Sequence, residues 1–292
     1  MVVQSIANGM IAASLYAMVG LGFGLTYSLF RFLNISHGVF IVAGPYSAFL
    51  FSAWCGFPLS LSLVLGAACG MALACLIEVT IYSPLRKRGA TSLVLLLASL
   101  GVYAFFQNLV STIFGDDAKR LSSGPVETGF LIGPVVIKPI QVSAIAMCVL
   151  SVVILALLLR FTKTGKGFRA VANNTALAEV CGVDARRLSL AACAIAGALA
   201  AVAGIMFALD VDMSPGMGLS ALMMGVIAVI IGGLGSTWGV LLGAVILALA
   251  QQSAIVLLGA QWRDPIAFVL LLGFLLFRPQ GFLGRKPKTS SI

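Results

Sequence analysis

The sequence predicts an all-α, polytopic membrane protein, a bundle of about eight to ten transmembrane helices with one long polar loop on the cytoplasmic side. Composition is the first reason, because 61% of the 292 residues are hydrophobic and 9% are charged, whereas about a quarter are charged in a typical soluble domain. The second reason is that the apolar runs are continuous over about 20 residues, which suits a membrane helix, instead of alternating over about 10 residues as in a membrane β-barrel.

Nine apolar segments account for the membrane crossings, and we interpret residues 1–292 as one domain. They span residues 5–29, 37–54, 58–81, 91–114, 140–159, 188–209, 219–231, 239–259 and 265–277. Segments 219–231 and 265–277 are shorter than the roughly 20 residues that a crossing needs. We therefore expect broken or tilted pieces at those two places. Because the number of crossings is odd, the two termini are predicted on opposite sides of the membrane.

Basic residues predict the orientation. Fourteen of the 18 Lys and Arg residues fall in loops and ends on one side of this bundle, and four on the other. Basic residues collect on the cytoplasmic side of membrane proteins, so the N-terminus is predicted outside the cell and the C-terminus inside. The basic tail over 278–292 is interpreted as an anchor at the cytoplasmic face. This placement explains the net charge of +9 without nucleic acid as a partner.

The residues that carry most enzyme and cofactor chemistry are scarce. The sequence has one histidine, His37, and its six cysteines form no Cys-x-x-Cys pair, so neither a metal site nor a disulfide framework is predicted. Ser36 does not face His37 on a helix, which argues against a serine-type catalytic pair. No Gly-x-x-x-x-Gly-Lys-Ser/Thr motif occurs, so the chain has no P-loop for ATP. We predict neither an enzyme nor a cofactor.

The polar segment 162–187 carries helix signals of its own. Asn174 is a good N-cap and Gly182 a good left-handed stop, and between them Leu177 and Val180 share one helical face. Upstream, Phe168, Val171 and Ala172 form a second short apolar stripe, with Arg169 turned away from it. Two short amphipathic helices joined by a polar turn are expected, and they suggest a docking element for a soluble partner. A solvated linker is the alternative, although it would need neither the apolar stripes nor the glycine.

Two segments interrupt the apolar pattern, residues 31–44 and residues 231–239. Irregular backbone near the bilayer is tolerated where protein or a water-filled cavity satisfies it, and broken segments in the two halves of a membrane protein point to a translocation path. For both segments the alternative is a cytoplasmic turn with helix caps. The candidate path residues are Asn34, Ser36, His37, Gly38, Gly232, Gly233 and Gly235.

The apolar runs contain few ionisable groups, and their number indicates what could supply the energy for transport. Glu78 is the one acid inside an apolar run, and it is either functional or paired with the basic cluster at residues 86–88. A proton- or sodium-coupled carrier buries several acids or histidines. We therefore expect the energy for any transport to come from another subunit.

Several segments together resemble the permease subunits of branched-chain amino acid ABC importers, the LivH type in particular. The resemblance covers nearly the whole length through residues 34–44, 82–85, 231–243 and the closing Arg278, Pro279, Gly281 and Phe282. Its strongest part is the polar loop, which resembles the cytoplasmic coupling loop of that family. The residues expected to couple this loop to an ATPase are Gly165, Phe168, Arg169, Ala170, Asn173, Ala176, Leu177, Val180 and Gly182.

The resemblance implies a permease in the cell inner membrane that imports branched-chain amino acids, with ATP hydrolysis on separate chains. It implies four kinds of contact: a second homologous permease, two ABC ATPase subunits, a periplasmic substrate-binding protein and the lipid bilayer. A permease for urea or short amides in the same family remains an alternative substrate class. An alternative from another class is a channel or secondary carrier that works alone.

Overall fold

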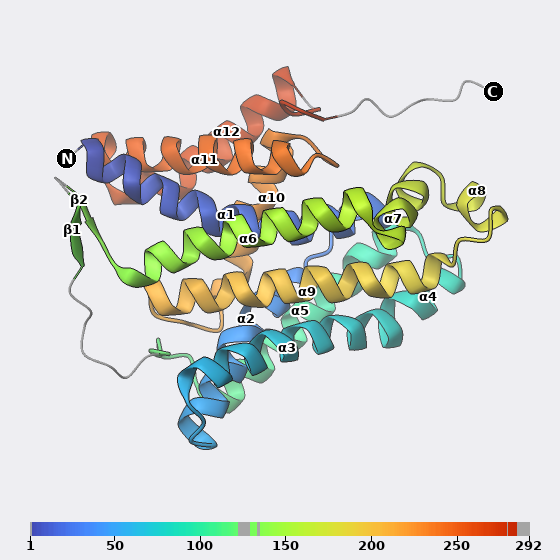
Figure 1. Ribbon diagram of the computed structural model, residues 1–292, viewed down its shortest axis with the longest axis horizontal. Coiled ribbons are helices and arrows are strands. Elements are labelled where there is room, and N and C mark those ends of the chain that lie inside the picture. Colours follow the sequence, from blue (N-terminus) through green and yellow to red (C-terminus); the bar gives the residue numbers. More distant parts are fainter. Residues whose placement is uncertain (1, 122–128, 133–134, 279, 285–292) are drawn as a thin grey trace.

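A computed structural model describes residues 2–121, 129–132, 135–278 and 280–284 as an elongated bundle of helices (Figure 1). In chain order the elements are α1 (Val2–Phe30), α2 (His37–Phe49), η1 (Leu50–Trp54), α3 (Leu59–Ile77), η2 (Glu78–Tyr82), α4 (Ser83–Lys87), α5 (Ser92–Phe114), β1 (Phe130–Ile132), β2 (Val135–Ile137), α6 (Pro139–Phe161), α7 (Lys163–Asn173), α8 (Thr175–Val180), α9 (Ala185–Asp210), α10 (Met217–Gly232), α11 (Thr237–Leu258), η3 (Ala260–Trp262) and α12 (Arg263–Phe277). Elements η1 and η2 are π-helical and η3 is a 3-10 helix. The all-α prediction is confirmed.

Each of the nine predicted apolar segments is helical in the structure. Within the described residues, seven helical segments are long and apolar enough to cross a membrane, and Met217–Gly232 is a shorter apolar helix. The remaining segment is α2, which continues into the π-helix η1. The helices run side by side along one direction (Figure 1).

The bundle has two distinct ends. Helices α7 and α8 lie beyond one end, and the antiparallel hairpin β1–β2 lies at the other (Figure 1); we call them the α7–α8 end and the hairpin end. Helix α1 starts at the hairpin end, where the side chain of Gln4 exchanges hydrogen bonds of 3.1 and 2.9 Å with the backbone of Val136. The last described residues lie at the C-terminal end of α10, where the Phe282 amide donates a hydrogen bond to the Ile231 carbonyl at 2.9 Å. This end of α10 is at the α7–α8 end of the bundle (Figure 1). The described chain therefore starts and ends at opposite ends of the bundle.

Small residues let α2, α3 and α9 pack closely. A methyl group on Gly204 of α9 would collide with the carbonyl oxygen of Ile41 in α2, and one on Gly70 of α3 would collide with the side chain of Ala201. Between helices in lipid, close van der Waals contact and not hydrophobic exclusion from water supplies the attraction. These three helices consequently pack with their backbones close together.

Helices α2 and α10 both begin inside the bundle. The ring of His37, the first residue of α2, lies against Gly22 of α1, about two turns before α1 ends. Gly218, at the start of α10, packs against the backbone of Gly38. The break that corresponds to residues 31–36 is therefore residues 211–216, ahead of α10, and not residues 231–239 as the sequence suggested. This also explains why segment 219–231 looked too short for a crossing.

Some predictions fall outside the described residues. They are Pro279 of the closing motif and Arg285, Lys286 and Lys288 of the basic tail. Several features of the described residues were not predicted: the short β1–β2 hairpin, the two π-helical turns, helix α4 and the 3-10 helix η3.

Candidate coupling surface and re-entrant segment

The α7–α8 unit, residues 162–184, is shaped by three capping side chains. Thr162 accepts a hydrogen bond from the Gly165 amide at 2.9 Å, Asn174 accepts one from Leu177 at 3.1 Å, and Asp184 accepts one from Arg187 at 3.1 Å. Such caps satisfy amides that helix starts leave free. Gly182 has a φ of +82° and ends the turn after α8 in the left-handed conformation. The predicted two-helix structure is confirmed.

Helix α7 is fixed to the bundle by one apolar face. Phe168 and Val171 are buried in the main hydrophobic core, while Arg169 between them is exposed. Gly165 lies so close to Leu158 and Leu159 of α6 that a β-carbon there would collide with their backbone. A side chain at this position would push α7 away from α6, so the glycine sets the angle between them.

Helix α8 has the opposite character. Leu177 is 61% exposed and Val180 is 85% exposed, whereas Ala178 is the one buried residue of this helix. The apolar face predicted from the sequence therefore points away from the bundle. Because α8 lies beyond the ends of the long helices (Figure 1), this face is not covered by the membrane helices. Exposed apolar side chains rimmed by polar residues are typical of protein interaction sites.

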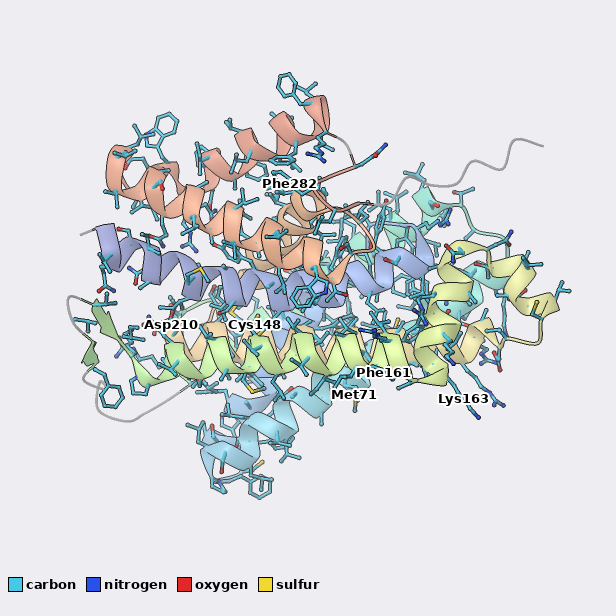
Figure 2. All side chains as sticks on the ribbon, turned by 45° about the horizontal axis from the view of Figure 1, so that its top comes forward. Met71, Cys148, Phe161, Lys163, Asp210 and Phe282 are labelled. Carbon is cyan, nitrogen blue, oxygen red and sulfur yellow. The ribbon has the colours of Figure 1, made fainter. Side chains whose placement is uncertain are left out.

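The other residues that were predicted to couple the loop to an ATPase fall into two groups, one buried against the bundle and one exposed. Gly165 and Phe168 are buried and Ala170 is half-buried, so they hold the unit in place. Arg169, Asn173, Ala176 and Gly182 are exposed with Leu177 and Val180. The exposed basic residues at this end include Lys163, which Figure 2 shows at the junction of α6 and α7, far from Asp210 at the other end.

A side-chain hydrogen bond ties the α7–α8 unit to the first interrupted segment. Arg31 follows the last residue of α1 and has a φ of +53°, a left-handed conformation that is uncommon outside glycine. Its guanidinium donates a hydrogen bond to the carbonyl of Ala172 in α7 at 2.9 Å. Residues 31–36, which we call the re-entrant segment, run back into the bundle from this point. Arg31 therefore connects α7 to the segment that leads into α2.

A buried polar cluster holds the far part of the re-entrant segment. The Asn34 side-chain oxygen accepts hydrogen bonds from the Tyr82 hydroxyl at 2.9 Å and from the Ser36 hydroxyl at 2.7 Å. The Ile35 amide donates to Ser99 of α5 at 3.1 Å. Asn34 and Ser36 thus belong to one buried cluster, and their place on a translocation path stays a prediction; Tyr82 was not singled out in the sequence. Its place in the π-helix η2 gives no periodic signal.

Glu78 pairs with Arg86, which was one of the two roles considered for it. Their ion pair joins η2 to α4, and the Arg86 guanidinium also lies over the ring of Phe30 at 4.6 Å from the ring centre. Phe30 is the last residue of α1. The pair therefore packs the end of α1 against η2 and α4, next to the re-entrant segment.

His37 and Gly38 have packing roles in the structure. The His37 ring is fully buried and lies between the rings of Phe23 and Phe40, with neither ring nitrogen bonded among the described residues. Gly38 meets Gly218 where α2 and α10 start. In the described part of the chain, no group of three His, Cys, Asp or Glu residues could hold a metal ion.

Gly232, Gly233 and Gly235 lie elsewhere, at the end of α10 and in the turn that leads to α11, at the α7–α8 end. Gly233 and Gly235 have φ values of +105° and +82°. The Leu283 amide donates to the Gly232 carbonyl at 2.9 Å, so the last described residues close over this turn. This is the turn that was the alternative to path lining, and it is separate from the re-entrant segment.

Two features of this region were not predicted from the sequence. The link through Arg31 could not be found, because Arg31 and Ala172 are far apart in the chain. The break before α10 left a usable signal, since polar Asp212 and Ser214 precede Pro215 and Gly216. Proline and glycine together mark a helix boundary.

Comparisons with known proteins agree over nearly the whole length. The sequence profile of the family described as "Branched-chain amino acid transport system / permease component" matches residues 5–277. The chain is 30% identical to the high-affinity branched-chain amino acid transport system permease protein BraD of Pseudomonas aeruginosa, over 97% of this chain and 95% of that protein. It is 28% identical to the corresponding permease protein LivH of Escherichia coli K12, with the same coverage.

A solved structure has the same arrangement of helices. The chain is similar to a chain of PsaBC from Streptococcus pneumoniae in complex with Fab, with a TM-score of 0.52 over 94% of this chain and 91% of that chain. The two are 11% identical in sequence, so this likeness shows the fold alone.

Proposed function

The chain belongs to the family of permease components of branched-chain amino acid transport systems, and on this premise we propose that it carries branched-chain amino acids through the membrane for an ATP-driven importer. It is a multi-pass membrane protein of a permease family that is not itself catalytic. ATP hydrolysis therefore belongs to other subunits. The partners that follow are a second homologous permease, two ABC ATPases and a periplasmic binding protein that delivers the substrate.

The observation that supports this function best is the exposed apolar face of α8. Leu177 and Val180 face away from the bundle on a unit that α7 fixes to the core through Phe168 and Val171. A loop without a partner gains nothing by exposing two large apolar side chains to water. We infer that an ATPase subunit covers them. The basic residues around α7 and α8 support a cytosolic position for this end, because basic residues collect on the cytoplasmic side of membrane proteins.

The proposed mechanism transmits motion from the ATPases into the bundle. When the ATPases close on ATP, they move the α7–α8 unit as one body because α7 and α8 are capped and joined by a short turn. The hydrogen bond from Arg31 to Ala172 passes that motion to the re-entrant segment. Helix α2 follows, since the re-entrant segment ends at its first residue. The result is a change in which end of the bundle is open.

The test is co-purification of the ATPases with this chain. Replacing Leu177 and Val180 with Asp in the same chain should abolish ATPase co-purification and ATP-dependent leucine uptake by the full transporter, because each change puts a charge into an apolar interface. The matched control is Val136→Asp, which changes an exposed valine at the hairpin end. Retained ATPase binding and uptake in the double variant would refute the coupling role. Leucine transport by vesicles that contain this chain alone, without ATP, would favour a stand-alone carrier.

A further inference from the structure

The structure contains a polar pocket that the coupling mechanism does not use. It has a volume of about 240 Å³ and lies where α1, α6, α9, α11 and α12 meet. Each of these five helices contributes one polar residue to the lining: Asn8, Gln141, Asp210, Gln252 and Arg263. Pockets for drug-sized ligands measure roughly 300–1,000 Å³, so this one has room for a smaller solute. A few polar groups that converge on one pocket are typical of a ligand site.

The pocket lies at the hairpin end and reaches the surface of the chain there. Figure 2 shows Asp210 at the end of the bundle opposite Lys163. Lys138, the residue after β2, has its ammonium 3.8 Å from the Asp210 carboxylate. Val211 lines the pocket and is 64% exposed, and Arg263 is exposed as well. The proposed orientation turns this end toward the substrate-binding protein.

Arg263 brings a positive charge to the pocket without a negative partner. Its guanidinium donates a hydrogen bond to the Tyr16 hydroxyl at 2.9 Å, and neither Asp264 nor any other acid among the described residues forms an ion pair with it. The Tyr16 hydroxyl donates to Gln251 at 2.8 Å, and the Gln251 amide donates to the Arg263 carbonyl at 3.1 Å. Tyr16 and Gln251 are buried. A buried network therefore holds the arginine, and its other N–H groups are available to an anion.

Asp210 brings the opposite charge to the same pocket. Its Oδ1 atom accepts a hydrogen bond from the Gln141 amide at 3.0 Å and is also the oxygen nearest to Lys138. Its Oδ2 atom makes no hydrogen bond within the part of the chain that the structure describes, and neither does the Gln252 amide. Asp210 and Arg263 line one pocket without pairing with each other. A ligand that carries both charges could therefore bridge them.

The remaining lining is mainly apolar, and it includes Ile11, Leu15 and Phe207. A zwitterion with an aliphatic side chain matches all three parts of the pocket: its carboxylate suits Arg263, its ammonium suits Asp210, and its side chain suits the apolar wall. An acidic side chain of a partner protein fits less well, because it would bring a second negative charge close to Asp210.

We propose that this pocket is a binding site for a zwitterionic α-amino acid with an aliphatic side chain, on the side that receives the substrate. The proposal rests on the proposed function and adds a place where the permease itself binds its substrate. Arg263 and Gln252 bind the carboxylate, Asp210 binds the ammonium, and Ile11, Leu15 and Phe207 contact the aliphatic part. A phosphatidylethanolamine headgroup carries the same pair of charges and is the other source of this chemistry.

The first experiment uses photo-leucine, a leucine with a diazirine in its side chain, on the full transporter in nanodiscs without the binding protein. Irradiation and peptide mass spectrometry should give adducts within residues 8–15, 207–211 or 252–263 that unlabelled leucine suppresses. Leucinamide, which lacks the carboxylate, and 4-methylpentanoate, which lacks the ammonium, should each need roughly tenfold or more higher concentrations, because each loses a hydrogen-bonded charge. Missing adducts, or adducts that leucine does not suppress, would overturn the proposal. Adducts that form only in nanodiscs without phosphatidylethanolamine would assign the pocket to the lipid headgroup and also overturn it.

The second experiment repeats this competition with two variants. Arg263→Gln should weaken suppression by leucine roughly tenfold or more and remove the advantage of leucine over leucinamide. Asp210→Asn should instead remove the advantage of leucine over 4-methylpentanoate. The matched controls are Arg120→Gln and Asp212→Asn, which break an exposed ion pair that does not line the pocket.

A general loss of folding would not exchange one ligand preference for another. Variants at Arg263 and Asp210 that keep both preferences would therefore overturn the proposal. Loss of binding-protein docking in Arg263→Gln with unchanged suppression by leucine would assign Arg263 to a protein interface instead. If a variant does not assemble, the ligand series on the unaltered transporter decides the question. If the unaltered transporter takes up no branched-chain amino acid, the proposed function fails; normal uptake without labelling of the pocket refutes this site alone.

Discussion

At the scale of single residues, the bundle depends on positions where no side chain fits. Gly204 lies against the carbonyl oxygen of Ile41, so the backbones of α9 and α2 are in contact there. Gly273 of α12 has nothing within reach of a β-carbon. Both glycines are in helices, and they differ in what surrounds them. Replacing each of them with alanine therefore separates the effect of packing on stability from the effect of helix propensity.

Gly204→Ala should lower the free energy of unfolding by about 1–3 kcal/mol, because the added methyl group overpacks a rigid backbone contact. Gly273→Ala should leave it unchanged or raise it by up to about 1 kcal/mol, since alanine is the better helix former. Unfolding of each purified variant in mixed micelles with increasing SDS measures the difference. Equal stability of the two variants would show that α2 and α9 do not pack as described.

At the scale of elements, the re-entrant segment joins the α7–α8 unit, α1, α2, η2 and α5. Arg31 bonds α7, Asn34 and Ser36 bond Tyr82, and Ile35 bonds Ser99. These bonds join elements that the chain separates by long distances. In the proposed mechanism, this short segment is therefore the element that moves with the α7–α8 unit and leads into α2.

Arg31→Asn should uncouple ATP hydrolysis from transport. Asparagine tolerates the left-handed backbone at this position, but its side chain is too short to reach Ala172. Leucine uptake by the full transporter should fall about fivefold or more, the range of typical coupling energies, while the ATPases still co-purify. Arg160→Ala is the control, because Arg160 is exposed at the same end and its guanidinium lies over the neighbouring ring of Phe161. Normal uptake in Arg31→Asn would exclude the Arg31 link from the mechanism.

At the scale of the whole molecule, the two ends of the bundle differ in charge and in structure. Most of the basic residues lie at the α7–α8 end, and the hairpin lies at the other. Each end also carries an exposed cysteine: Cys55, which follows η1 near the hairpin end, and Cys181, which follows α8. The native chain thus contains a probe for each side of the membrane.

A membrane-impermeant maleimide should label Cys55 in intact cells and Cys181 only after the cells are broken open. Cys55→Ser and Cys181→Ser identify the labelled position by loss of signal. The reason is the positive-inside rule, which puts the α7–α8 end in the cytosol. Labelling of Cys181 from outside intact cells would reverse the proposed orientation and leave α8 unable to meet an ATPase.

The sequence by itself determined the class, the helices and the local structure of the coupling unit. Hydropathy along the chain marks each of the nine apolar helical segments, and the caps Asn174 and Asp184 and the stop Gly182 act within one turn of their positions. It also predicted an orientation, which stays a prediction, because the asymmetry of basic residues can be counted without knowing any contact.

Only the tertiary structure decided where α2 and α10 begin and which residues meet the re-entrant segment. Arg31 and Ala172, or Tyr82 and Asn34, are brought together by the packing of helices that the chain does not connect directly. A π-helical turn shifts every later side chain around the helix axis without changing the apolar pattern much. The depth at which a helix begins in the bundle, and the contacts between distant segments, depend on how whole helices pack. Periodicity along the sequence does not show how helices pack.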